Sequence, residues 1–258
     1  QQADTVSVTL YVGNGSSEGG SAAGLVIDTE VMILTESANV SGVFRSASAG
    51  VTLTDTATPA VSDGRVSWGR SDTLSLSYVD VTGASEDTVD TALALEIAST
   101  GAVTLIEDSL FTDDPDTFLT RDMFFVQVQD TDENRNPQMA DTVSVVVYIA
   151  NAASGGGVAG LVLDTQTMVL TENSAVSGIF RSDTWVVTDT ELPSAESGRL
   201  SWGLSDTLHA SYTDVTGTSE SSSDTALAIE IKSNAVVQFY EDNLYTDDVD
   251  TFFSRNDI

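Results

Sequence analysis

Side chains that carry oxygen ligands are concentrated in the turn 130–137, near the middle of the 258-residue chain. Acidic and amide side chains recur there at every second residue, and one more carboxylate follows. The candidate ligands are Asp130, Asp132, Asn134, Asn136 and Asp141. Calcium takes about six to eight hard oxygen ligands, which Asp and Asn side chains in a tight loop supply, whereas magnesium retains its waters. The spacing predicts a calcium site; a solvated turn rich in Asp and Asn is the alternative, because both residues favour turns for local reasons.

The opening of this turn has the D-x-D-x-N order of an EF-hand loop, but the rest departs from it. Arg135 stands where that loop needs glycine, and Asp141 stands where glutamate is usual. The flanking segments alternate apolar and polar residues, which is typical of strands and not of helices. We therefore expect a metal loop between strands or between domains.

Two carboxylates at the ends of other expected strands complete this site. Glu172 and Asp214 are the candidates, and Glu36 and Asp80 occupy the matching places earlier in the chain. A weaker metal prediction concerns a second acidic cluster, which is more typical of a solvated acidic rim. Its residues are Glu107, Asp108, Asp113, Asp114 and Asp116, repeated as Glu241, Asp242, Asp247, Asp248 and Asp250.

The elements that position these residues are expected to be strands. In 123–129, Phe124, Val126 and Val128 face one way, and 143–147 continues the alternation after the turn. Period-two alternation indicates a half-buried strand. In Ala92–Ile97 the same reasoning turns Leu93 and Leu95 inward.

The chain consists of two copies of one module. ADTVSV at 3–8 returns at 140–145, and SWG-x-SDTL returns with the same spacing from Ser67 and Ser201. We divide it into repeat 1, residues 1–121, and repeat 2, residues 122–258, with 122–136 as linking strand and acidic turn. Short strands at regular spacing predict an all-β protein of two tandem immunoglobulin-like β-sandwich domains. Trp68 and Trp202 are expected in the cores.

The strand at 123–129 occurs once although the module occurs twice, so one domain is a strand short. An unpaired edge in a β-sandwich is a liability unless another segment covers it. A neighbouring chain supplying the strand would give head-to-tail contacts that build filaments. The alternative is that the sequence is a window of a longer repeat array.

The composition excludes several classes of function. Forty acidic residues against nine basic ones give a formal charge of −31, which disfavours nucleic acid and anionic membranes. There is no cysteine and a single histidine, His209, so zinc and Cys–His catalysis are not expected. No apolar run approaches the roughly 18 residues of a membrane helix. The first residue, Gln1, is consistent with a secreted protein after removal of its signal peptide, or with a fragment.

The order of motifs resembles tandem repeats of large bacterial and archaeal surface proteins. The matching segments are Phe125–Asn134, Ala140–Val145, Leu170–Phe180 and Ser205–Asp214, with Ser71 and Ser205 where the pattern often has glycine. The resemblance implies an extracellular, calcium-stabilised immunoglobulin-like module of an adhesin, surface layer or fibre.

We therefore expect a non-enzymatic structural protein at the cell surface that polymerises with copies of itself. An adhesin stalk or tip that binds glycans or another cell is the alternative, with exposed Trp185 and Tyr240 as recognition residues present in one copy only. A third interpretation is a halophilic secreted protein whose acidity serves solubility in brine. None of the three predicts a nucleic-acid partner or insertion into a membrane.

Overall fold

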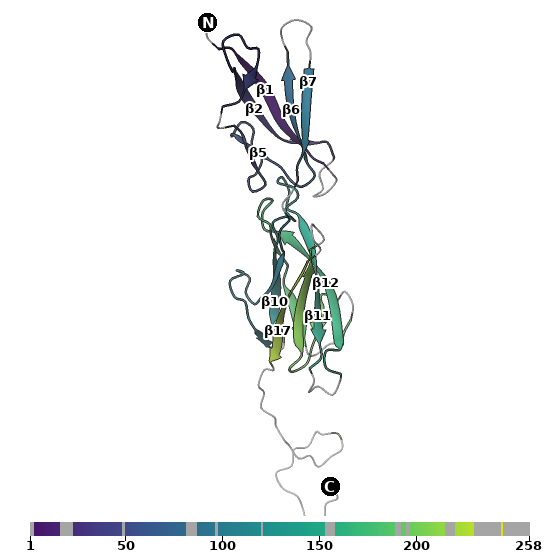
Figure 1. Ribbon diagram of the computed structural model, residues 1–258. Helices are drawn as coiled ribbons and strands as arrows, with labels where there is room; N and C mark the ends of the chain where they lie inside the picture. The colour runs from purple at the N-terminus through teal and green to yellow at the C-terminus, as the bar shows by residue number, and fades with distance from the viewer. Residues whose placement is uncertain are drawn as a thin grey trace, which may run out of the picture.

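The protein folds into two all-β bodies arranged end to end (Figure 1). The computed structural model describes residues 3–15, 23–47, 50–80, 87–95, 98–119, 121–152, 158–188, 192–194, 197–214, 220–229 and 244. The regular structure in these ranges consists of strands that pack as sandwich-like layers, which confirms the all-β prediction. The described residues contain no helix long and apolar enough to cross a membrane.

The first body is built on one five-stranded sheet of order β3-β2-β1-β6-β7, with the parallel pair β4-β5 packed beside it. Its strands are β1 (Thr5–Gly13), β2 (Val26–Glu36), β3 (Phe44–Arg45), β4 (Thr52–Thr54), β5 (Arg65–Ser67), β6 (Thr73–Val79) and β7 (Asp87–Leu93). β5 contacts β1 and β2 from the facing layer, which has two short strands among the described residues.

The second body contains the counterparts of these strands and three more. Its strands are β8 (Ala102–Ile106), β9 (Thr117–Leu119), β10 (Met123–Gln129), β11 (Thr142–Ala150), β12 (Val162–Glu172), β13 (Ile179–Arg181), β14 (Trp185–Thr188), β15 (Arg199–Ser201), β16 (Thr207–Thr213) and β17 (Ser221–Ile229). The sheet runs β15-β14-β10-β13-β12-β11-β16-β17-β9, and β8 pairs with the other edge of β10. The sheet folds over at β10 into two facing layers. β8 therefore contacts β16 and β17, and β15 contacts β11 and β12.

The pairing of β8 and β9 differs from the division of the sequence into repeats. Residues 102–119 belong to repeat 1 by sequence, yet β8 pairs with β10 and β9 pairs in parallel with β17. The second body therefore takes in the last part of repeat 1. Among the described residues, the first body has no counterpart of β8, β9 or β10, which makes its gap wider than one strand.

Strands β8 to β10 close the core of the second body. Phe124, Val126 and Val128 of β10 are fully buried, as their alternation predicts. They join Leu105 of β8 and Phe118 of β9 in one cluster with the inward residues of β11, β12 and β16. Trp202 lies in this cluster, as expected.

The equivalent face of the first body is open. Among the described residues, its core cluster consists of Leu10, Val12, Ile27 and Val66, with Trp68 packed partly against it. Leu93 and Leu95 do not point inward as expected, since they are 63% and 76% exposed. Their counterparts in the second body are outward too, and the inward positions there carry the small residues Ala226 and Ala228.

Two matching turns contain serine in a conformation that favours glycine. Ser71 and Ser205 both have φ of 68°, in the left-handed region where a Cβ is disfavoured. In these turns the Asp72 carboxylate accepts the backbone N–H of Gly69, and the Asp206 carboxylate accepts that of Gly203. The two bodies therefore share local structure, and the difference between them lies in what covers the sheet.

The acidic turn after β10 contacts the first body directly. Asn134 Nδ2 donates to the carbonyl of Asp55 at 2.8 Å, and Gln138 Nε2 donates to the carbonyl of Ile27 at 3.0 Å. Gly69 lies against the Arg135 carbonyl, which a Cβ at that position would approach to 1.8 Å. The predicted metal turn is thus also the joint between the bodies.

The open face gives the two repeats different sensitivities to the same substitution. We expect Leu208→Ala, in the closed core, to lower the free energy of unfolding by about 2–5 kcal/mol, as buried Leu→Ala changes do. Leu74→Ala, at the matching but half-exposed position, should cost clearly less because Leu74 already contacts solvent. Urea unfolding followed by tryptophan fluorescence measures both; equal costs would contradict the open face.

Candidate metal centre

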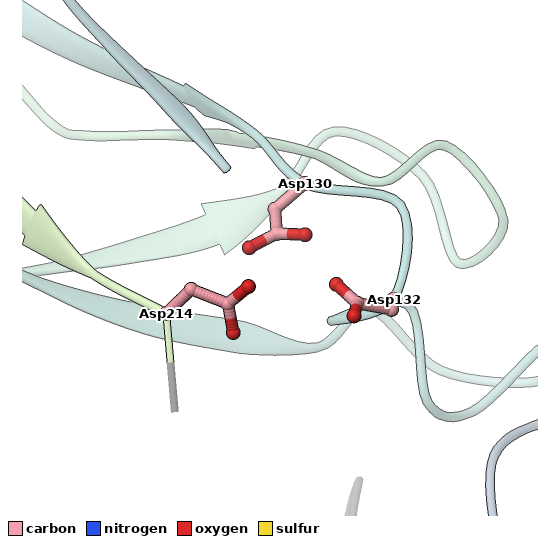
Figure 2. A group of neighbouring side chains, drawn as sticks. All are labelled: Asp130, Asp132 and Asp214. Atoms are coloured by element: carbon pink, nitrogen blue, oxygen red, sulfur yellow. The ribbon is translucent and has the colours of Figure 1, made fainter. Parts of the chain in front are cut away.

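Three buried carboxylates meet at the end of the second body that faces the first. Asp130 follows β10, Asp132 lies two residues later, and Asp214 follows β16. Each offers an oxygen within 4.8 Å of the others, and all three residues are buried. Figure 2 shows the three side chains converging on one point. The structure therefore brings together three of the predicted ligands, in a buried group that could hold a metal ion.

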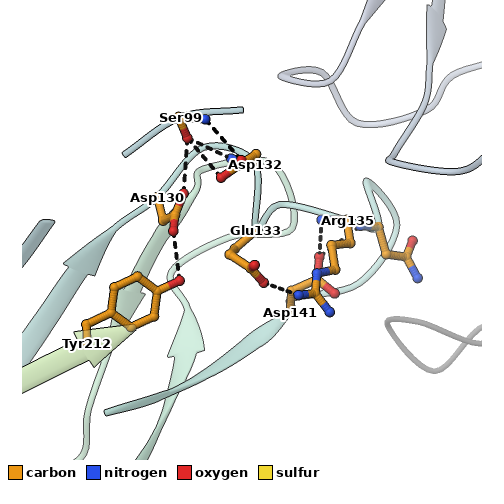
Figure 3. A network of polar contacts seen from close by, with 8 residues as sticks. Ser99, Asp130, Asp132, Glu133, Arg135, Asp141 and Tyr212 are labelled. Atoms are coloured by element: carbon orange, nitrogen blue, oxygen red, sulfur yellow. Dashed lines mark hydrogen bonds and ion pairs between the residues drawn. The ribbon is translucent and has the colours of Figure 1, made fainter. Parts of the chain in front are cut away.

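Ser99 and Tyr212 hold two of these carboxylates in place (Figure 3). Ser99 Oγ lies 3.1 Å from Asp130 Oδ1 and 3.0 Å from Asp132 Oδ1, and the Ser99 backbone N–H donates to Asp132 Oδ2 at 3.0 Å. The Tyr212 hydroxyl donates to Asp130 Oδ2 at 2.7 Å. Gly101 permits this packing, because a Cβ there would lie 2.4 Å from the Tyr212 ring.

Burial and mutual repulsion disturb the ionisation of this group. Burial, the contact with Asp132 and the charge of Asp214 raise the pKa of Asp130 to about 7, against a smaller lowering by the Tyr212 hydrogen bond. Burial also raises the pKa of Asp132. The contact with Asp130 and the hydrogen bonds from Ser99 outweigh the effect of burial, so the pKa of Asp132 is lowered. Carboxylates this close and this buried require a shared proton or a bound cation.

Asn134 is a further candidate ligand, in the same turn as Asp130 and Asp132. Its side chain is buried, and its Nδ2 is used in the bond to Asp55 across the joint. Its Oδ1 accepts no hydrogen bond from any residue that the structure describes. A buried carbonyl oxygen without a donor is costly in the absence of a cation or water. The donor set consists of oxygens only, which fits a hard cation.

The remaining predicted ligands in the turn hold backbone amides. Asp141 Oδ2 accepts N–H groups from Arg135 at 2.7 Å and Asn136 at 2.8 Å. Glu172 accepts N–H groups from Asp141, Ser177 and Gly178. Asn136 Oδ1 accepts the N–H of Gln138. These contacts fix the shape of the turn, and neither Asp141 nor Glu172 belongs to the group of three carboxylates.

The weaker acidic cluster is not gathered into a site among the described residues. Asp113, Asp114 and Asp116 are exposed, and no second group of metal-binding geometry is found in the described ranges. Their neighbour Asp108 caps its own loop by accepting N–H groups from Leu110 and Thr112. The repeated residues Asp247, Asp248 and Asp250 lie outside the part of the chain that the structure describes.

The residues expected to form an aromatic recognition patch do not form one in the described structure. Trp185 is half-buried, pairs with Phe124 across β10 and β14, and packs against the core of the second body. Tyr240 lies outside the described residues. His209 stacks on Tyr148 with ring centroids 4.6 Å apart, in the sheet and away from the carboxylates.

Sequence reasoning did not identify Ser99, Tyr212 or the pair of Glu133 and Arg135 at this site. One signal was present for Tyr212: it precedes Asp214 by two residues on an alternating strand, so both point the same way. Ser99 carries no comparable signal, because its position depends on how 98–101 crosses from one body to the other.

Calcium should bind to the carboxylates and stabilise the fold. We expect millimolar calcium to raise the melting temperature, since a ligand at about ten times its Kd adds roughly 1.4 kcal/mol to stability. Asp214→Asn should abolish most of that rise. Asp113→Asn removes the same charge from an exposed site and serves as the matched control. Calorimetry with calcium and with EDTA measures both; an unchanged rise in Asp214→Asn would remove Asp214 from the site.

The metal-free protein should lose stability as the pH rises. Asp130, with a pKa of about 7, and Asp141, whose burial raises its pKa to about 6, hold protons that the unfolded chain releases near pH 4. Stability therefore falls between about pH 4 and pH 7, because the folded state binds more protons there. Melting temperatures in EDTA should decline across this range, and calcium should abolish much of the decline. A rising melting temperature would contradict the assigned pKa shifts.

Comparison with known proteins leaves the function to be argued from this site. No protein-family model matches the chain, and the curated proteins yield no match. The buried carboxylates, and the joint in which they lie, are therefore the features from which a function can be inferred.

Proposed function

We propose that this protein is an extracellular structural subunit that assembles end to end into a filament or surface layer, with calcium stabilising the joint between its two bodies. The observation that carries the proposal is the double role of the turn after β10. It contributes Asp130 and Asp132 to the buried carboxylates, and its Asn134 bonds to Asp55 of the first body. A cation bound there would hold the joint rigid.

The chemistry of the joint supports calcium over other cations. Asp130, Asp132 and Asp214 offer carboxylate oxygens, and Asn134 Oδ1 offers a neutral one. Soft metals prefer sulfur or imidazole ligands, and the chain has no cysteine. Calcium accepts irregular oxygen cages, and extracellular modules bind it with Kd values of about 10⁻⁴–10⁻³ M. The surrounding medium would then keep the site filled.

Three properties support a linear assembly. The two bodies stack along one axis, as modules of a fibre would (Figure 1). The first body presents an open sheet face, which needs a cover. The formal charge of −31 opposes close packing of copies unless cations neutralise part of it. Calcium would thus act twice, at the joint and on the surface. The resemblance to tandem surface-protein repeats agrees with this role, and we infer no catalysis.

Sedimentation of the full chain tests the proposal. We expect mainly monomer in EDTA and a series of larger, elongated species in millimolar calcium, because cations both order the joint and reduce repulsion. Asp214→Asn should need more calcium for the same assembly, whereas Asp113→Asn should behave like the unmodified chain.

Sodium chloride at matched ionic strength separates this role from simple adaptation to salt. If sodium alone drives the same assembly and the same rise in melting temperature, the acidity serves solubility in brine and the calcium role is wrong. A monomer at every calcium concentration would contradict the assembly itself.

A further inference from the structure

We propose that the open face of the first body is the docking site for residues Val236–Phe253 of a second copy of this chain. The inference rests on the proposed end-to-end assembly and identifies its contact. The segment lies outside the described residues apart from Leu244, so the argument runs through its repeat in the second body.

Residues 236–253 repeat residues 102–119, which form β8, β9 and their connection. More than half of the aligned positions are identical, including the run from Thr112 to Asp114. The positions that matter for packing stay apolar: Val103, Leu105 and Phe118, all buried in the second body, correspond to Val237, Phe239 and Phe252. A second copy therefore carries a segment with the side chains that close such a core.

The first body has kept the side chains that hold β8 in the second. There, Asp224 Oδ2 accepts the N–H of Leu105 at 2.7 Å and Ser222 Oγ accepts the N–H of Val103 at 3.0 Å. The matching residues are Asp90 and Thr88, which offer the same kinds of acceptor.

Asp90 also has the orientation that this role needs. Its Oδ1 accepts the N–H of Thr91 at 2.9 Å, as Asp224 Oδ1 accepts the N–H of Thr225 at 2.7 Å. In Asp224 this contact leaves Oδ2 for the incoming strand. Asp90, in an open body, is therefore already arranged as an acceptor for a strand.

A groove in the first body marks where an aromatic side chain would enter. It has a volume of about 200 Å³ and is lined by Leu53, Trp68, Leu74, Ala92, Leu93, Ala94 and Leu95. Leu53, Trp68 and Leu74 correspond to Val187, Trp202 and Leu208, which are buried in the core of the second body together with Phe118. Phe118 pairs with Ala228, the counterpart of Ala94. The equivalent of Phe118 is Phe252, so this groove is the expected place for the Phe252 ring.

The open face must be filled by another copy because a chain cannot reach its own groove. β17 starts after Glu220, which bonds to Asp214 at the joint, and ends at the far end of the second body (Figure 1). Residues 230–235 can span only about 20 Å when extended, whereas the nine-residue strand β11 alone is about 30 Å long. β17 instead ends where a body stacked beyond the second one would begin, as β7 ends where the second body begins.

Disulfide trapping between full-length chains tests this docking. In the second body Leu227 pairs with Thr117, so Leu93→Cys in one chain and Thr251→Cys in another should be strand neighbours. The chain has no cysteine of its own. Mixed in calcium with a mild oxidant, the two variants should form a mixed disulfide about ten-fold faster than unpaired surface thiols, because docking raises their effective concentration.

Two controls make the result specific. Val40→Cys, in an 82% exposed position at the other end of the first body, should link to Thr251→Cys only at the background rate. Adding Phe252→Asp to the Thr251→Cys chain should remove the advantage of Leu93→Cys, since the groove is apolar. Equal rates for Leu93→Cys and Val40→Cys, or no effect of Phe252→Asp, would overturn the docking.

The outcome separates the docking from the assembly on which it rests. Calcium-dependent assembly without this disulfide would mean that copies join elsewhere, so the docking is wrong and the structural role stands. If the disulfide forms but sedimentation shows only dimers under all conditions, the docking is supported and the filament is contradicted.

Discussion

The inward face of the sheet formed by β11, β12 and β16 has to be covered, and the strands that cover it come from earlier in the chain. β8 and β10 lie over this face. The side chains of Leu105, Phe124 and Val126 are fully buried in the core and exclude water from it. Burying such side chains contributes about 1.5–3 kcal/mol each. The core of the second body therefore depends on β8, β9 and β10, which follow β7 of the first body in the sequence.

The carboxylate group is a consequence of the same arrangement. Asp130 is the residue directly after β10, and Ser99, which contacts two of the carboxylates, lies just before β8. When β8 and β10 cover the sheet, their joint-facing ends bring these residues to Asp214 at the end of β16. Any cation bound there is held by the covering strands and by the covered sheet together. Strand packing and cation binding are thus coupled, and each should strengthen the other.

Local features could be predicted from the sequence, and pairing over long distances could not. Alternation predicted β10 and β11 with the correct inward residues, and the spacing of Asp130 and Asp132 with the strand-end position of Asp214 predicted the carboxylate group. The repeat, however, gives no information on which body receives 102–119, because identical residues are compatible with either. Leu93 and Leu95 were assigned the wrong face since large apolar residues were expected inward, whereas the covering strands require small residues there. Asp141 and Glu172 have the chemistry of ligands, and in the structure their carboxylates accept backbone N–H groups of the turn and of the loop after β12.

The difference between the two bodies is best explained by what covers them and not by how they are built. Asp28 accepts the N–H of Ser67 as Asp164 accepts that of Ser201, so the framework beneath the open face matches that beneath the closed one. Leu74 and Leu208 differ in exposure although both occupy the same place on equivalent strands. The first body carries the apolar side chains of Leu74 and Trp68 on this face, and Asp90 stands at the place of Asp224. In the proposed docking, these residues form one half of a contact, and the repeat of 102–119 in a second copy supplies the other half.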